Sequence, residues 1–297
     1  MKANGKTVLL SAPTGRAAQR MSELTGDEAK TLHRLLEVSW DKHDNPVFNK
    51  NERNQLKCDA LIVDEVSMVD AFIMESVMRA LSTGCRLIPV VRLNEIFRQA
   101  QQSLIVTNAH KIVNGEIPIL NFADKDFFFL QRNNKSEVSA VIADLCANRL
   151  PKAYGYSPFE NIQVLAPSKK GELGTAELNH KLQAALNPKD DDKAEITIGS
   201  KTFRTGDKVM QIRNNYEKDV FNGDIGRVIK IDGKNVTVAF PERPEGDYVT
   251  YAQGEVEELQ LAYAMSVHKS QGSEYPYVIL LMVQSHYIML QRNLLYT

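Results

Sequence analysis

Two adjacent carboxylates that follow an apolar run are the strongest local indication of chemistry in this sequence. The segment ALIVDEVSMVD places Asp64 and Glu65 directly after a predicted strand at 60–63. Open α/β sheets bind ligands at the carboxyl ends of their strands. Two acids there suit nucleotide hydrolysis, in which Asp64 would hold Mg²⁺ through water and Glu65 would orient and deprotonate the attacking water. The alternative is a surface acid pair after a core strand.

A second group of candidate residues follows the first predicted strand, at 7–12. Pro13, Thr14 and Gly15 form a turn before a helix that begins at Arg16. Exposed amides and a hydroxyl at such a turn can hold a phosphate, and that phosphate could belong to a nucleic acid. The alternative is an ordinary strand–helix turn with Arg16 on a solvated helix face.

The triplet Gly5-Lys6-Thr7 matches the last letters of the phosphate-binding loop G-x-x-x-x-G-K-[ST]. That motif also requires an earlier glycine and a helix directly after the threonine. An apolar run at 8–12 follows instead, so we expect this triplet to form a turn that leads into a strand.

Two further segments combine polar groups with apolar neighbours. In LNEIFRQA, Arg98 and Gln99 follow an aromatic residue, where an arginine can stabilise the charge of a transferred phosphoryl group. Pairing of Arg98 with Glu95 is the alternative. In AYAMSVHKSQGSEY, a predicted strand leads to a polar cluster that favours phosphate or sugar contacts. The members of this cluster are Ser266, His268, Lys269, Ser270, Gln271, Gly272 and Glu274.

Alternating strands and helices must position these candidates over most of the first 190 residues. The predicted elements are strands 7–12, 60–63, 126–130 and 162–166 and helices 16–24, 70–82, 101–113, 136–149 and 175–186. Such alternation favours a parallel sheet with helices on its faces. A further helix carries Leu32, Leu35 and Leu36, and the polar residues 38–56 are compatible with a short exposed hairpin.

Residues 196–258 have a different pattern. Short alternating runs separated by Asn-Gly, Asp-Gly and Glu-Gly turns predict a small antiparallel barrel. Its lysines and arginines suit contact with a nucleic-acid backbone or, equally, a solvated surface. The α/β pattern then resumes with predicted strands 260–264 and 277–282 and a helix at 286–295, so the barrel is expected to be an insertion.

The overall composition limits the class of protein. A length of 297 residues predicts about two domains, and the net charge of −1 excludes a globally basic nucleic-acid binder but not a basic groove. Cys58, Cys85 and Cys146 lack metal-ligand spacing and are expected to be buried thiols of a cytoplasmic protein. We expect no membrane segment, because no apolar run reaches spanning length.

Taken in order, these segments resemble the RecD-like branch of superfamily 1 DNA helicases, the family of the exodeoxyribonuclease V alpha subunit. LIVDEVSMVD is similar to the Walker B motif of this family, LNEIFRQA to its motif IV, and YAMSVHKSQGSEYP to its motif V. Three longer segments also resemble the family, namely LLSAPTGRAAQRMSELTG with KTLHRLL, VLAPSKKGELGTAELNHKLQAALNP, and FRTGDKVMQIRNNYEKDVFNGDIGRV. The first of these is similar to motif Ia with its downstream DNA-contacting segment. The second is similar to part of the second motor domain, and the third to the SH3-like barrel. The resemblance covers almost the whole chain.

The resemblance implies an α/β fold with two RecA-like parallel-sheet motor domains and a small SH3-like β-barrel inserted in the second. The first motor domain would be residues 1–91, the second 92–195 with 259–297, and the barrel 196–258. Residues 38–56 would form the pin that splits a duplex. The implied activity is ATP-dependent 5′–3′ DNA unwinding in repair or recombination. ATP and Mg²⁺ are the implied cofactors, and single-stranded DNA, duplex junctions and other helicase–nuclease subunits the implied partners.

The resemblance also implies roles for individual residues. Glu65 and Asp64 would serve water activation and Mg²⁺ binding, and Arg98 would reach the γ-phosphate across the cleft between the motor domains. Gly272, Glu274 and Gln99 would contact the nucleotide, with Glu274 at its ribose. The implied contacts to the DNA strand are Pro13, Thr14, Gly15, Arg16, His33, Ser266 and His268.

The sequence departs from the family pattern in three places. The phosphate loop expected before the first strand is absent, and so is its lysine. Motif III is absent where CRLIPVVRLNEIF runs straight through, which predicts a junction with missing residues at Ile88-Pro89. The chain stops at QRNLLYT, before motif VI and its arginine. We interpret the sequence as a fragment and expect negligible ATP hydrolysis from it alone.

Two other functions remain open from the sequence. The first is a non-catalytic nucleic-acid-binding module that has lost ATP hydrolysis. The second is an unrelated nucleotide-dependent kinase or transferase, for which the sequence specifies no acceptor site. Hydrolysis of ATP that depends on DNA would separate the helicase from both.

Overall fold

The computed structural model describes residues 5–40, 46–88, 103–120, 126–215, 217–241, 243, 246–271 and 273–296. The chain divides into two compact units, Met1–Arg92 and Leu93–Thr297. Each unit contains its own parallel sheet. Among the described residues, no helix has both the length and the apolar character needed to cross a bilayer.

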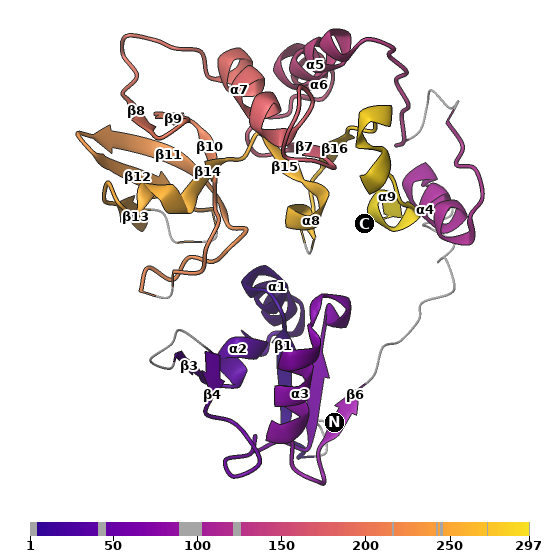
Figure 1. The fold of residues 1–297 in the computed structure, drawn as a ribbon, viewed down its shortest axis with the longest axis vertical. Coiled ribbons are helices and arrows are strands. Elements are labelled where there is room, and N and C mark those ends of the chain that lie inside the picture. The colour runs from indigo at the N-terminus through magenta and orange to yellow at the C-terminus, as the bar shows by residue number, and fades with distance from the viewer. Residues whose placement is uncertain are drawn as a thin grey trace. The chain divides into compact units, whose positions relative to one another are not determined.

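The first unit, drawn in indigo to purple in Figure 1, is built on a four-stranded parallel sheet. Its strand order is β2-β1-β5-β6. Its strands are β1 (Val8–Ala12), β2 (Ala29–Thr31), β5 (Ala60–Val63) and β6 (Arg86–Ile88). In the central pair, β1 and β5, Ser11 lies beside Val63, so both strands end at the same edge of the sheet. The predicted strands at 7–12 and 60–63 are therefore confirmed.

The helices of this unit begin and end at residues suited to those positions. Helix α1 (Gly15–Thr25) is capped by the Thr14 hydroxyl, which accepts a hydrogen bond from the Ala17 amide, and ends at Gly26 in the left-handed region. Helix α3 (Ala71–Ala80) is capped in the same way by Asp70. These bounds confirm the predicted helices at 16–24 and, within two residues, at 70–82.

Apolar side chains cover both faces of the first sheet. On one face, Leu61 and Val63 of β5 pack with α3 and with the short helix α2 (Leu32–Leu35). The predicted core residues Leu32, Leu35 and Leu36 are all buried. On the other face, Ala12 packs against the alanines of α1. Because helices cover both faces of the sheet, polar groups can gather only at its edges.

A short hairpin follows α2, as predicted for residues 38–56. Strands β3 (Val38–Trp40) and β4 (Pro46–Phe48) pair antiparallel, with Val38 opposite Phe48. The Phe48 ring lies 5.8 Å from the Phe72 ring, centroid to centroid. Phe48 therefore packs against α3, whereas the Trp40 side chain lies outside the described residues.

The second unit contains a three-stranded parallel sheet in the order β15-β7-β16. Its strands are β7 (Ile162–Ala166), β15 (Ala264–Ser266) and β16 (Tyr277–Leu280), and its first helix is α4 (Leu104–Asn114). Helix α7 (Thr175–Leu186) packs on this sheet through Leu178 and Leu182. The structure confirms the predictions at 162–166 and 175–186 and places a helix close to 101–113.

Helix α5 (Lys135–Asp144) continues through a π-helical turn, Leu145–Arg149, into α6 (Leu150–Tyr154). Pro151 has no amide hydrogen to donate to the carbonyl one turn earlier, and a widened turn accommodates a residue of this kind. The predicted helix at 136–149 is confirmed, but the helical run extends to Tyr154, before Gly155 with its φ of 71°.

The inserted stretch Glu195–Leu261, called the antiparallel segment below, forms a five-stranded antiparallel sheet and a two-stranded hairpin. The sheet has the order β13-β12-β11-β10-β14. Its strands are β10 (Lys208–Gln211), β11 (Ile225–Asp232), β12 (Asn235–Ala239), β13 (Tyr248–Tyr251) and β14 (Leu259–Leu261), and the hairpin strands are β8 (Glu195–Ile198) and β9 (Lys201–Arg204). A short 3-10 turn, η5 (Val256–Glu258), precedes β14.

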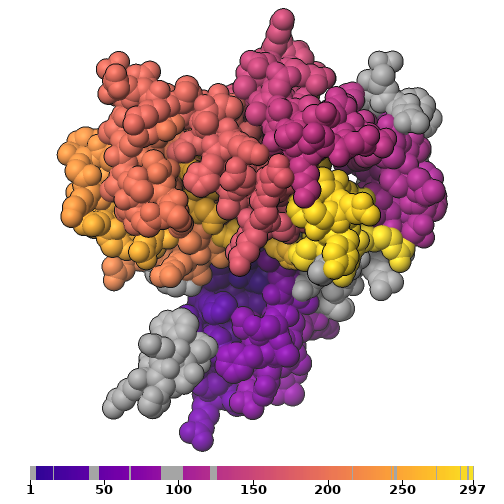
Figure 2. All heavy atoms as spheres, turned by 45° about the horizontal axis from the view of Figure 1, so that its top comes forward, coloured from indigo at the N-terminus to yellow at the C-terminus, as the bar shows by residue number. Residues whose placement is uncertain are grey.

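One continuous core joins the antiparallel segment to the parallel sheet of the same unit. Phe203 and Val228 of the antiparallel segment are buried in one cluster with Ile162, Val164 and Leu178 of the α/β part. In Figure 2 the orange surface of the antiparallel segment lies directly against the pink surface of the preceding helices. The insertion is therefore packed into the unit and is not a separate lobe.

A buried carboxylate also ties these parts together. Asp207 is 0% exposed, and its Oδ1 accepts hydrogen bonds from Asn187 Nδ2 at 2.8 Å and Tyr263 Oη at 2.8 Å. Its Oδ2 accepts from Gln183 Nε2 at 2.6 Å and the Arg204 amide at 2.7 Å. Burial raises the pKa of this carboxyl, while the donated hydrogen bonds oppose the rise.

Two predicted elements of the second unit are wrong. Residues 126–130 form no strand, because Asp126 instead binds the start of α4 through Ser103 and the Leu104 amide. Phe128 and Phe129 are exposed as a result.

The predicted strand at 260–264 is also wrong, since the chain changes sheets within it. Leu261 pairs antiparallel with Val209 in β10, whereas Ala264 pairs parallel with Val164 in β7.

The predicted helix at 286–295 is split into two shorter helices. A 3-10 helix, η6 (Gln284–Met289), and helix α9 (Arg292–Tyr296) take its place. His286 has non-helical backbone angles, with φ −96° and ψ 19°, inside the first of them. The predicted strand at 277–282 is confirmed as β16, two residues shorter.

Candidate functional site

The carboxyl edge of the first sheet brings two groups of predicted site residues together. Strands β1 and β5 are neighbours, and the Asp64 amide donates a hydrogen bond to the Ser11 carbonyl at 2.9 Å. The acid pair that follows β5 and the turn that follows β1 therefore leave the sheet side by side. Parallel pairing of two strands is the cause, because it aligns their carboxyl ends.

Asp64 and Glu65 stand at this edge in different environments. Asp64 is exposed, and its Oδ1 accepts a hydrogen bond from the Glu65 amide at 2.9 Å. Glu65 is half-buried and has φ 51° and ψ 37°, a left-handed conformation that is rare for a residue with a side chain. The bend turns the chain sharply after β5 and into the 3-10 turn η2 (Val66–Met68).

The turn that follows β1 is formed by Pro13, Thr14 and Gly15, all of them half-buried. Thr14 caps α1 by accepting the Ala17 amide at 3.2 Å, so its hydroxyl hydrogen can still be donated to a ligand. The helix begins at Gly15, and helix α1 contains 11 residues. Arg16 belongs to this helix, but its side chain lies outside the described residues.

His33 lies on the short helix α2 of the same unit. It is half-buried, and its ring centroid is 6.1 Å from that of Phe48. The ring therefore stands next to the hairpin β3–β4. Such an aromatic group beside a polar edge can stack on a base or pack the hairpin.

Lys6 shows that the Gly5-Lys6-Thr7 triplet belongs to a turn. The Lys6 ammonium is 2.9 Å from Asp59 Oδ1, and the Thr7 amide donates to Asp59 Oδ2 at 2.8 Å. These two bonds fix the turn to the start of β5, as we expected from the sequence. They also lower the pKa of Asp59.

In the second unit, the predicted polar cluster follows β15 at the carboxyl edge of that sheet. Ser266 is buried before the short helix α8 (Val267–Ser270), and no helix amide caps onto its side chain. His268 and Glu274 are exposed. The cluster thus offers a buried hydroxyl and an exposed imidazole two residues apart at the start of α8.

A group of basic residues near α8 was not predicted as a group. Burial and the charges of Lys169 and Lys201 lower the pKa of Lys269. Burial also lowers the pKa of Lys201, and the nearby charge of Arg213 lowers it further. These residues come from four separate stretches of sequence, so no local pattern could have shown that they meet.

Three predicted site residues lie outside the described residues. They are Arg98, Gln99 and Gly272. Pro89, at the predicted junction, also lies outside them, whereas Ile88 ends β6.

Three family profiles match this chain. Residues 1–91 match an AAA domain, residues 178–240 the SH3 domain of ATP-dependent RecD-like DNA helicases, and residues 261–297 the UvrD-like helicase C-terminal domain. The SH3 match includes most of the antiparallel segment.

Among curated proteins, the ATP-dependent RecD2 DNA helicase of Deinococcus radiodurans is 34% identical over 317 residues, which include 99% of this chain. The chain is a homologue of the RecD-like DNA helicases. The RecD subunit of the RecBCD enzyme of Mycolicibacterium smegmatis is 25% identical over 98% of the chain. This RecD-like chain spans 41% of the length of the first relative and 59% of the second.

Solved structures of Pif1 helicases share the fold. One, described in a study of DNA unwinding at forked duplexes, has a TM-score of 0.54 and 18% identity, covering 98% of the RecD-like chain and 78% of its own. Another, Pif1 from Bacteroides in complex with ADP-AlF3 and single-stranded DNA, has a TM-score of 0.52 and 18% identity, covering 94% and 77%. The predicted fold class, two α/β parts with an inserted SH3-like domain, is confirmed.

Proposed function

We propose that this chain provides the motor of an ATP-dependent DNA helicase or translocase that moves 5′ to 3′ along single-stranded DNA. The observation that supports the proposal most is the carboxyl edge of the first sheet. There Asp64 and Glu65 leave β5 next to the turn at Pro13–Gly15. Acids and phosphate-binding amides at one edge are what nucleotide hydrolysis on a parallel sheet requires.

Glu65 is the residue that we propose to activate water. Its left-handed backbone fixes the direction in which the side chain leaves the strand. A carboxylate held in this way can orient a water molecule and accept its proton as the phosphoryl group is transferred. Arg98, outside the described residues, is proposed to stabilise the charge on the γ-phosphate.

Asp64 is the residue that we propose to hold Mg²⁺. Its carboxylate is exposed at the sheet edge, and Oδ1 is oriented by the Glu65 amide. Mg²⁺ is commonly bound by one or two carboxylates together with substrate phosphates and water. When bound, Mg²⁺ neutralises phosphate charge.

The DNA strand is proposed to contact both units. Thr14 offers a hydroxyl in the first unit, and Ser266 and His268 offer polar groups in the second. Lys201 and Lys269 add positive charge close to the second set. Contacts of this kind bind the phosphate backbone without reading sequence.

Further roles rest on the relatives alone. We propose that Gly272, Glu274 and Gln99 contact the nucleotide and that the hairpin within residues 38–56 separates duplex strands. RecD relatives are subunits of the RecBCD enzyme. We therefore propose duplex junctions as substrates and helicase–nuclease subunits as partners, in DNA repair or recombination.

A second candidate is a nucleic-acid-binding module that does not hydrolyse ATP. The basic residues near α8, Lys201 and Lys269 among them, favour it, because contacts to phosphates need no ATP hydrolysis. In this case the basic groups of the second unit would still bind DNA.

DNA-stimulated ATP hydrolysis separates the two functions. It should be measured for this chain and for a chimera that supplies, from the Deinococcus RecD2 relative, the three segments that the family pattern places before the first strand, after Ile88 and after Thr297. We expect negligible hydrolysis by the chain alone and hydrolysis stimulated by single-stranded DNA in the chimera. A folded chimera that binds DNA but hydrolyses no ATP would support the binding module instead.

A further inference from the structure

Two of the three cysteines of the chain lie next to each other in the first unit. Cys58 precedes β5 and Cys85 precedes β6, and their Sγ atoms are 3.2 Å apart. The two residues are 27 positions apart in the sequence, so the parallel pairing of β5 with β6 is what brings them together. Neither thiol has a part in the proposed ATP or DNA site.

The sheet fixes the backbone around this thiol pair. Ala60 lies opposite Arg86, and the Arg86 amide donates a hydrogen bond to the Asp59 carbonyl at 2.9 Å. The two cysteines therefore leave neighbouring strands, which lie about 4.8 Å apart in a sheet. A disulfide joins Cα atoms about 4.4–6.8 Å apart, so the strand register already suits a bond between these residues. The sulfur atoms have to approach each other by about 1 Å, which rotation of the side chains can provide.

The thiol pair is half-buried beside the apolar core that covers one face of the sheet. Exposed residues flank it, namely Lys57 before the first cysteine and Thr83 and Gly84 before the second, so a small oxidant can approach from solvent. Burial and, to a smaller extent, the hydrogen bond with Cys85 raise the pKa of Cys58 to about 12. The Cys58 thiol is therefore protonated near pH 7 and can share that hydrogen bond.

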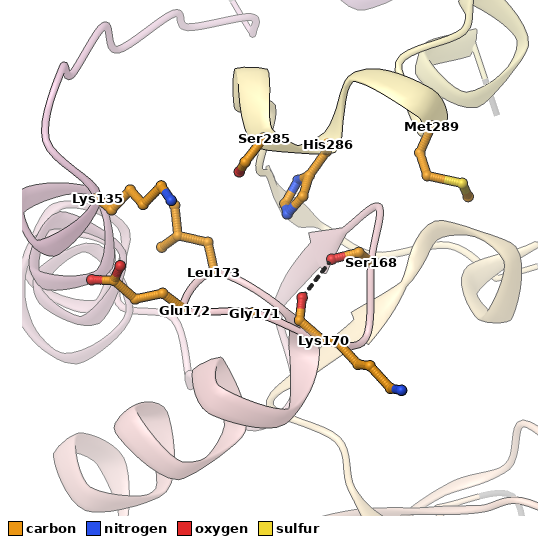
Figure 3. A pocket seen from close by; sticks show the side chains of 9 residues that line it. All are labelled: Lys135, Ser168, Lys170, Gly171, Glu172, Leu173, Ser285, His286 and Met289. Atoms are coloured by element: carbon orange, nitrogen blue, oxygen red, sulfur yellow. Dashed lines mark hydrogen bonds between the residues drawn. The ribbon is translucent and has the colours of Figure 1, made fainter.

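Cys146 differs from the thiol pair and provides an internal reference. It is 2% exposed and packs in the continuous core of the second unit. The pocket of the second unit shown in Figure 3 is lined by nine residues, and Cys146 is not one of them. Cys146 should therefore keep its thiol under conditions that oxidise the thiol pair.

We propose that Cys58 and Cys85 form a reversible dithiol–disulfide couple, which a small disulfide such as oxidised glutathione converts into a covalent link that stabilises the first unit. One protein thiol loses its proton to water and attacks a sulfur atom of the glutathione disulfide, whose S–S bond breaks and releases one glutathione. The second protein thiol loses its proton, attacks the protein sulfur of the mixed disulfide and releases the other glutathione. Two protein thiols are oxidised to one disulfide, one glutathione disulfide is reduced to two thiols, and the two protons pass to the glutathione sulfurs.

The disulfide closes a loop that contains β5, the acid pair and helix α3. Asp64 and Glu65 follow the carboxyl end of β5, whereas both cysteines precede the amino ends of their strands. The link therefore leaves the acid pair unobstructed. A cross-link of this kind stabilises a fold mainly by restricting the unfolded chain. The proposal goes beyond the proposed function, because it depends on neither ATP hydrolysis nor DNA binding.

Thiol–disulfide exchange tests the couple in the whole chain. The reduced protein is incubated with excess glutathione disulfide, the remaining thiols are blocked with iodoacetamide, and the intact mass and a non-reduced peptide map are recorded. We expect the loss of two hydrogen atoms, alkylation at Cys146 alone, and a linked peptide that contains Cys58 and Cys85. Dithiothreitol should restore all three thiols.

Thermal unfolding tests the stabilising effect of the link. Trp40 is the single tryptophan of the chain and belongs to the first unit, so its fluorescence reports on the unfolding of that unit. The unfolding midpoint should be higher by about 5 °C or more in the oxidised chain than in the reduced chain. Dithiothreitol should reverse this shift.

Cys58→Ser is the test variant, and Cys146→Ser is its matched control. Without Cys58, glutathione that reacts with Cys85 should remain attached as a mixed disulfide, and no linked peptide should form. Cys146→Ser should form the same link as the wild type. The proposal is overturned if the wild-type pair stays reduced, if it retains glutathione as Cys58→Ser does, if other cysteines are linked, or if oxidation does not raise the midpoint. The linked peptide and the midpoint are read from the wild-type chain, so they decide the question even where a variant does not fold.

Discussion

Glu65 illustrates how one residue can serve a site at a cost to the fold. It follows a buried strand, and its φ of 51° places it in a region that residues with a Cβ atom avoid. Strained backbone of this kind is common at functional sites. The strained conformation is therefore consistent with a carboxylate that must point toward the attacking water, as proposed for Glu65.

Replacing Glu65 with glycine tests this interpretation of the strain. Because glycine adopts a positive φ without a steric penalty, Glu65→Gly should raise the free energy of unfolding by about 0.5–1 kcal/mol. Urea unfolding followed by circular dichroism measures the change. The control is Glu65→Ala, which keeps the Cβ atom and should not stabilise the protein. A Glu65→Gly variant that is less stable than the wild type would contradict this account.

Individual site residues were predicted to different extents from the sequence. The positions of Asp64 and Thr14 at the sheet edge were predicted because a local apolar run ended just before each of them, and strand ends are visible in a sequence. The proximity of Lys169, Lys201 and Lys269 was not predicted, because it depends on how the antiparallel segment packs against the parallel sheet.

At the scale of elements, the buried carboxylate of Asp207 connects α7, the antiparallel segment and the residue just before β15. Burial raises its pKa above the ordinary value of 3.8. A carboxyl with a raised pKa in the folded state contributes stability that is fully present below its unfolded pKa. This contribution is lost as the pH rises through the folded pKa.

The variant Asp207→Asn should reveal this dependence on pH. Its amide cannot accept all four donated hydrogen bonds, so we expect the variant to be less stable than the wild type throughout. The stability advantage of the wild type should decrease as the pH rises from about 3.8, because only the wild type then buries a charge. Urea unfolding at a series of pH values measures it. An advantage that grows with pH would show that the four donors lower the pKa.

Elements were predicted well where one local pattern decided them. The strands 60–63 and 162–166 and the helix 175–186 have the predicted bounds. The prediction at 260–264 was wrong because a single apolar run is shared by two sheets, and pairing partners are distant in sequence. The prediction at 126–130 was wrong because an apolar run forms a strand only when another strand pairs with it.

At the scale of the whole molecule, the two compact units share one arrangement. Each has a parallel sheet whose carboxyl edge presents polar groups, Asp64 and Glu65 in the first unit and Ser266 and His268 in the second. The SH3 domain of RecD-like helicases matches the inserted part, and the Pif1 structures share the fold with its two sheets. We propose that ATP is hydrolysed at the edge of the first sheet.

The most direct test is the rate of DNA-stimulated ATP hydrolysis by the chimera that carries Glu65→Gln. The control is the chimera that carries Glu75→Gln, on an exposed face of α3. Loss of a catalytic base should slow hydrolysis by about 100-fold or more, while binding of single-stranded DNA is retained. The control should hydrolyse ATP at the rate of the parent chimera. Equal rates for Glu65→Gln and its parent would contradict the account.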